Sequence, residues 1–135
     1  MIAATVIAIW VFFGVGGGPF GELLEHAKDP IKSTITDKDR RKMALEELTS
    51  LNNAVEELNK GVSKDIKQFH KLVENYDSNW EQFDKMISAS AEERQQELDT
   101  IWDRRGAMLK YIHADEWQAI VKGAQAKVKE KEKKL

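Results

Sequence analysis

Apolar residues recur every three or four positions through the middle of the chain. This spacing keeps one stripe of an α-helix facing a partner, as in a coiled-coil seam. It predicts one helix over residues 37–87, roughly 75 Å long, with Thr36 as its cap and acidic residues in its first turn. The stripe consists of Leu48, Leu51, Val55, Leu58, Val62, Ile66, Phe69, Val73, Tyr76, Trp80, Phe83 and Ile87.

A second apolar pattern follows a break at residues 88–90. Ser90 followed by Glu93 is a capping-box sequence, which predicts a helix start. Helices over residues 91–112 and 115–133 together nearly match the first helix in length, so they can fold back along it. The predicted fold is therefore all-α, a long antiparallel helical hairpin with a broken second arm. A three-helix bundle is the alternative.

The N-terminal segment is strongly apolar and has no charged side chain before Glu22. As a helix, residues 2–20 would be roughly 28 Å long, close to the thickness of a hydrocarbon core. A cleaved signal peptide is the competing interpretation, but no Lys or Arg precedes the apolar run and no Ala-x-Ala site follows it. We expect a hydrophobic membrane anchor or signal segment over residues 1–20, a juxtamembrane connector over 21–35 and a helical hairpin domain over 36–135.

Composition narrows the classes of function. Charged residues make up 33% of the 135 residues, yet the formal net charge is only -2. This balance argues against nucleic-acid binding, which requires a concentrated basic face. The chain has no cysteine, which excludes disulfides and thiolate chemistry. We expect a non-enzymatic protein without cofactor, metal or small-molecule substrate.

The candidate chemistry is sparse. None of the three histidines has metal-ligand spacing, and His113 with Asp115 and Glu116 is better interpreted as a helix junction with capping acids. The glycine run 16–18 lacks the Lys and the Ser or Thr of a phosphate-binding loop. Aromatic residues at apolar positions are instead the candidate stripe for protein binding or packing, namely Phe69, Tyr76, Trp80, Phe83, Trp102 and Trp117.

Three stretches carry a resemblance to known proteins: Ile35-Thr36-Asp37-Lys38-Asp39-Arg40-Arg41, Arg104-Arg105, and Ile112-His113-Ala114-Asp115-Glu116-Trp117. The pattern resembles small bacterial membrane-anchored helical proteins and, more distantly, the Spy and CpxP group of periplasmic helical proteins. The Leu-Thr-x-x-Gln motif of that group is absent as written, with Ala114 where the capping Thr would be. The resemblance implies an extracytoplasmic, dimeric helical hairpin that binds unfolded proteins or senses envelope stress. It transfers no functional residue.

Two cues bear on location. Lys28, Lys32 and Lys38 follow the apolar segment, and the positive-inside rule would place them in the cytoplasm. The resemblance favours the periplasmic side, so we expect a single-pass protein of the bacterial inner membrane with a periplasmic helical domain. The expected function is an envelope protein-binding module, chaperone-like or scaffolding, with a protein partner or as a homodimer. A cytoplasm-facing assembly subunit of a membrane protein complex is the alternative.

Overall fold

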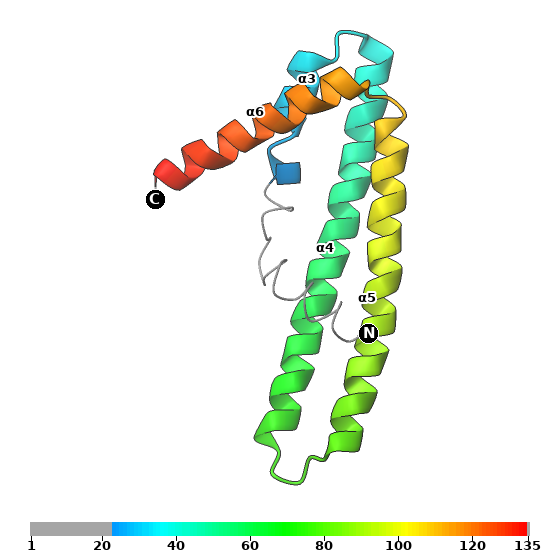
Figure 1. The fold of residues 1–135 in the computed structure, drawn as a ribbon, viewed down its shortest axis with the longest axis vertical. Helices are drawn as coiled ribbons and strands as arrows, with labels where there is room; N and C mark the ends of the chain where they lie inside the picture. Colours follow the sequence, from blue (N-terminus) through cyan, green and yellow to red (C-terminus); the bar gives the residue numbers. More distant parts are fainter. Residues whose placement is uncertain (1–22, 135) are drawn as a thin grey trace.

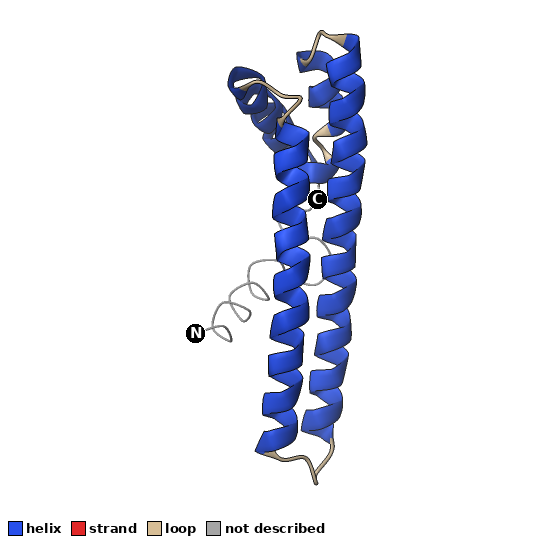
Figure 2. Cartoon of the chain, turned by 90° about the vertical axis from the view of Figure 1, so that its right-hand side faces the viewer, coloured by secondary structure: helices blue, strands red, loops and turns tan. Residues whose placement is uncertain are grey.

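The computed structural model describes residues 23–134, and within this range the chain is helical with no strand. Its main helices are α3 (Lys28–Thr34), α4 (Lys38–Glu74), α5 (Trp80–Leu109) and α6 (Ala114–Lys133). Helices α4 and α5 lie side by side as a long antiparallel hairpin, while α3 and α6 lie across one end of it (Figures 1 and 2). The predicted all-α class is confirmed.

Helix α4 forms where the apolar spacing predicted it. Asp37, rather than Thr36, is the N-cap, and its side chain accepts a hydrogen bond from the Arg40 backbone N–H at 2.8 Å. This bond satisfies one of the free donors of the first turn. The predicted stripe is buried from Leu48 to Val62. The first half of the stripe is therefore a true core face.

The hairpin turn lies at residues 75–79, and the prediction of one helix to residue 87 is wrong. The Asn75 side chain accepts the Asp77 N–H, and Asn79 and Gln82 form a capping box that starts α5. Short polar side chains that bond nearby backbone groups compete with the helix at this point. The predicted break at Ser88-Ala89-Ser90 instead lies inside α5, where Ser90 is buried.

Helix α6 does not extend the second arm along α4, so the prediction of a broken second arm is wrong and the second arm is α5 alone. Helix α6 turns away after residues 110–113 and packs on α3, with Ile31 and Ile120 buried (Figure 1). Close packing is possible because a Cβ at Gly123 would lie only 3.0 Å from Cγ of Pro30. The three-helix bundle is not formed either, since α6 leaves the hairpin axis.

The stretch expected to be a juxtamembrane connector contributes to the core over residues 24–35. Ile31 and Ile35 are fully buried, and Leu24 and Ala27 are nearly so. Pro30 lies in the first turn of α3, where a missing N–H costs no helix hydrogen bond. This end of the hairpin is thus a compact layer of α3, α6 and the start of α4.

The expected membrane anchor, residues 2–20, lies outside the described residues. Between residues 23 and 134, none of the helices combines the length and the apolar character that a membrane crossing needs.

Candidate functional site

Aromatic and aliphatic side chains gather at the free end of the hairpin, opposite α3 and α6. We call Phe69, Val73, Tyr76, Trp80 and Phe83 the tip surface. Phe83 packs edge-on against Phe69, with ring centroids 5.8 Å apart, and lies 5.4 Å from the Trp80 ring. Yet Val73 is 65% exposed, Trp80 73% and Tyr76 98%. The tip surface is a pre-assembled aromatic group that water still reaches.

The tip has no buried layer. None of the residues from 66 to 89 is buried, although this stretch holds the whole tip surface. In the other half of the hairpin, by contrast, Leu51, Leu58 and Met108 are fully buried. Two helices cover only one face of each other, and the α3 and α6 layer does not reach the tip (Figure 1). The same apolar pattern therefore gives a core at one end and an open surface at the other.

A shallow groove of about 400 Å³ lies beside the tip surface. Leu72 and Met86 supply its apolar lining, and Gln68, Lys71, Gln82 and Lys85 supply polar groups. An apolar floor with amide and ammonium groups at its edge resembles the anatomy of protein interfaces, which have an apolar centre and a polar rim.

A charge network centred on a buried arginine separates the tip from the core. Arg94 of α5 is 2% exposed and lies among three carboxylates. Its Nη1 donates to Glu97 at 2.8 Å and its Nη2 to Glu93 at 2.9 Å. Its Nε lies 3.3 Å from Oδ2 of Asp65, which α4 supplies and which is 3% exposed. We call these four residues the Arg94 network.

Gly61 provides the space for this arginine. A Cβ at position 61 would lie 1.1 Å from Nη1 of Arg94 and 2.2 Å from its Cζ. The guanidinium therefore occupies the volume that any other side chain at this position would take. Gly61 therefore has a packing role that joins α4 to α5.

Burial changes the acid–base properties of the network. Burial raises the pKa of the Asp65 carboxyl above its usual value, while the Ser90 hydroxyl and the Arg94 charge act in the opposite direction. Burial likewise raises the pKa of Glu97, again opposed by Arg94. The cost of removing these carboxylates from water exceeds what the single shared arginine returns.

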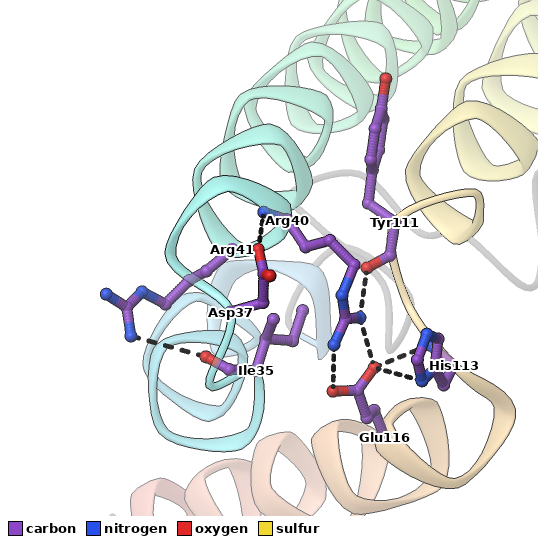
Figure 3. Close-up of polar contacts among 7 residues, drawn as sticks. All are labelled: Ile35, Asp37, Arg40, Arg41, Tyr111, His113 and Glu116. Atoms are coloured by element: carbon purple, nitrogen blue, oxygen red, sulfur yellow. Dashed lines mark hydrogen bonds and ion pairs between the residues drawn. The ribbon is translucent and has the colours of Figure 1, made fainter.

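A second polar group joins α4 to α6 at the other end (Figure 3). Arg40 donates to both carboxylate oxygens of Glu116, at 2.7 and 3.1 Å, and to the Tyr111 carbonyl at 3.0 Å. Glu116 also accepts the His113 backbone N–H at 2.8 Å, which caps α6. The Arg40 hydrogen bonds, followed by that backbone bond, lower the pKa of Glu116 from 4.5 to about 2. We call Arg40, His113 and Glu116 the α6 joint.

The remaining predicted aromatic residues meet near this joint. Arg105 of α5 lies over the Trp102 ring, 4.8 Å from its centroid, and 5.8 Å from the Trp117 ring of α6. Trp102 is 67% exposed. A guanidinium within about 6 Å of an indole ring centroid is a cation–π arrangement. We call these three residues the arginine–tryptophan cluster.

The predicted aromatic stripe is thus two groups rather than one. Phe69, Tyr76, Trp80 and Phe83 lie at the tip, while Trp102 and Trp117 lie at the joint. Along α5 alone, Trp80 and Trp102 are roughly 33 Å apart.

The sequence interpretation missed the Arg94 network. Its signal was a charged residue at core spacing, with Ile87, Ser90, Arg94, Leu98 and Ile101 three or four positions apart.

The metal interpretation of His113 gains nothing from the geometry. Glu116, its neighbour in the sequence pattern, is engaged by Arg40. Among residues 23–134, no cluster of three or more His, Cys, Asp or Glu side chains is placed to hold a metal ion.

Comparisons of the chain with protein-family models, with curated proteins and with solved structures found no match. The function of the chain is therefore inferred from the arrangement of its described residues.

Proposed function

We propose that this protein is a non-enzymatic helical module that binds another protein through the tip surface. One observation carries the proposal: the stretch 66–89 holds no buried residue, yet it carries Phe69, Tyr76, Trp80 and Phe83. Contiguous exposed apolar side chains on a soluble domain are typical of interaction sites. Trp and Tyr are also the residues most enriched where binding energy concentrates.

The energetics favour binding at this end. Covering one large apolar side chain contributes about 1.5–3 kcal/mol, and aromatic pairs add about 0.5–1.5 kcal/mol. Because the Phe69, Phe83 and Trp80 rings already contact one another, a partner need not order them on binding. This pre-organisation lowers the entropic cost of association.

We further propose that residues 2–20 anchor the protein in a bacterial inner membrane, with the hairpin on the periplasmic side as an envelope chaperone-like or scaffold module. The support is the uncharged apolar composition of that segment. Alkaline phosphatase and green fluorescent protein fusions at the C-terminus test the orientation. Phosphatase activity is the expected result, and fluorescence alone would favour the cytoplasm-facing alternative.

Site-specific photocrosslinking tests the binding proposal in the full-length chain. Benzoylphenylalanine replaces Val73 in the tip surface or, as the matched control, exposed Glu56 on the same helix. We expect a discrete adduct from position 73 and none from position 56. Two differently tagged copies of the chain distinguish an adduct with a second copy from one with another protein.

A pair of substitutions in α5 provides the specificity control for that experiment. Trp80→Ser should reduce the position-73 adduct by at least about fivefold, an effect near 1 kcal/mol. Arg104→Ser, at an exposed position far from the tip on the same helix, should leave the adduct unchanged. The proposal fails if position 73 gives no adduct, or if the two variants have the same effect.

A further inference from the structure

The arginine–tryptophan cluster holds a cation in a fixed place without an anion. The Arg105 guanidinium carbon lies 4.8 Å from the Trp102 ring centroid and 5.8 Å from that of Trp117. Stacking on aromatic faces leaves the edge of a guanidinium, where its N–H groups lie, available for hydrogen bonds. The rings therefore restrict the motion of this side chain and leave its donors free.

The other core-side arginines differ in this respect. Arg40 is bonded to Glu116, Arg41 to the Ile35 carbonyl, and Arg94 to carboxylates. Among residues 23–134, Arg105 makes neither a hydrogen bond nor an ion pair. The two indole rings contact the guanidinium of Arg105, but among the described residues no acceptor contacts its N–H donors.

The cluster is also open to a ligand. Trp102 is 67% exposed, and no heavy atom beyond the chain neighbours of Gly106 and its own helix backbone lies within 4 Å of a Cβ placed at Gly106. The nearby acids do not fill the site: Asp99 accepts a hydrogen bond from Gln95 at 3.0 Å. Asp103 projects about 160° away from Arg105 around the helix, given about 100° per residue. An anion can therefore approach beside the indole.

We propose that the arginine–tryptophan cluster is a second docking site, distinct from the tip surface, for a carboxylate-bearing segment of a protein. The fork of Arg105 would accept a carboxylate in a bidentate pair, while the Trp102 indole covers an adjacent apolar side chain. Arg and Trp together are the residue types that dominate interface energetics. This site does not depend on the tip surface, and either one can fail without the other.

Peptide titration of the full-length protein in detergent micelles tests the site. The probe is a capped peptide that alternates glutamate and leucine, and the matched probe replaces each glutamate by glutamine. The readout is the indole N–H resonances of the tryptophans, assigned by single Trp→Phe variants. The glutamate peptide should shift the signals of Trp102 and Trp117 but not that of Trp80. The glutamine peptide should bind at least about tenfold more weakly.

Variants separate a specific fork from general positive charge. Arg105→Lys keeps the charge but loses the planar fork, and should weaken peptide binding about tenfold. Arg104→Lys, at the adjacent exposed position, should change affinity less than about twofold. The tip variant Trp80→Ser should bind the peptide normally. Circular dichroism tests whether each variant is folded. If Arg105→Lys is unfolded, Trp102→Ser provides a second substitution in the cluster.

Three outcomes would overturn the proposal: equal binding of the two peptides, equal effects of the Arg104 and Arg105 variants, or a matching shift of Trp80. Vesicles containing phosphatidylglycerol form a further arm. If the Trp102 and Trp117 resonances shift with vesicles and not with the glutamate peptide, the ligand is a lipid headgroup rather than a protein segment.

Discussion

At the scale of single residues, the Arg94 network shows how a charge can specify a pairing. Arg94 and Asp65 are both nearly inaccessible to water, and only glycine at position 61 leaves room for the guanidinium. Sliding α5 by one turn would bring Arg94 against other α4 side chains. A buried ion pair that forms in only one alignment favours that alignment.

Gly61→Ala should therefore destabilise the protein, although alanine is the better helix former. The new Cβ would lie 1.1 Å from Nη1 of Arg94. The flexible arginine can move away only by leaving buried Asp65 without its cation. We expect a loss of roughly 1–3 kcal/mol in the free energy of unfolding by urea denaturation.

Gly106→Ala is the matched control for that substitution, because nothing lies within 4 Å of its added Cβ. It should stabilise by about 0.5–1 kcal/mol through helix propensity alone. If both alanine variants stabilise, Arg94 does not depend on the space at Gly61.

Glu116 makes the α6 joint sensitive to acid. Its pKa is lowered from 4.5 to about 2 in the folded protein, so its stabilising effect is complete above pH 4.5 and is lost as the pH falls toward 2. Glu116→Gln should have a lower thermal midpoint than the wild type at pH 6. The gap between the two should close between pH 4.5 and 2.

Arg40→Gln should reproduce that profile, because it removes the cation that lowers the pKa of Glu116. Asp65 and Glu97 act in the opposite direction, since their raised pKa values favour folding in acid. Comparing each variant with the wild type at the same pH cancels those contributions. A gap that is independent of pH would contradict the assignment of Glu116.

At the scale of elements, the start of α5 depends on local chemistry at the turn. Asn79 accepts the Gln82 N–H at 3.0 Å, and the Gln82 side chain accepts the Asn79 N–H at 3.1 Å. These bonds start α5 in a stretch whose apolar spacing would otherwise continue α4. Because none of the residues 66–89 is fully buried, such a cap contributes more to the first turn of α5 than it would in the core.

Asn79→Ala should cost about 1 kcal/mol of unfolding free energy, with its effect concentrated at the tip. Hydrogen exchange should accelerate in the first turns of α5 and change little near Met108. Asn53→Ala, at an exposed interior position of α4, should be neutral or slightly stabilising. Uniform acceleration along α5 would mean that the cap supports the whole hairpin.

At the scale of the whole molecule, the hairpin has two ends of different character. One end is closed by α3 and α6, with Ile31, Ile35 and Ala124 fully buried. The other end presents the tip surface, and the Arg94 network lies at the boundary. Local opening is easiest where few buried apolar contacts hold the chain. The end proposed to bind a partner is thus also the end that can adapt to one.

Native-state hydrogen exchange should show this division. Amides of residues 66–74 and 80–89 should exchange through local openings, well below the free energy of global unfolding. Amides of residues 44–62 should exchange only through global unfolding, as their side chains form the core. Binding of a partner at the tip should slow the first group selectively. Equal protection of both halves in the free protein would contradict the division.

Several features follow from the sequence alone. Three predictions depend only on spacings of three or four residues and on short-range capping. They are the all-α class, the apolar seam from Leu48 to Val62 and the start of a further helix just after His113. These signals act between neighbours in the chain, so they are readable without knowing what lies opposite. The sequence also indicates six aromatic residues as candidates for protein binding or packing, but it does not show that they form two separate groups.

Only the tertiary structure decided where the chain reverses, which half of the stripe is covered and where α6 lies. The turn at residues 75–79 and the serines at 88–90 are competing local signals. Asp65 and Gly61 contact Arg94, which is distant from them in the sequence. Only a chain reversal at residues 75–79 brings these residues together. The direction of α6 depends in the same way on Arg40 meeting Glu116 and on Pro30 meeting Gly123. Such choices depend on free energies that exist only once separate segments touch.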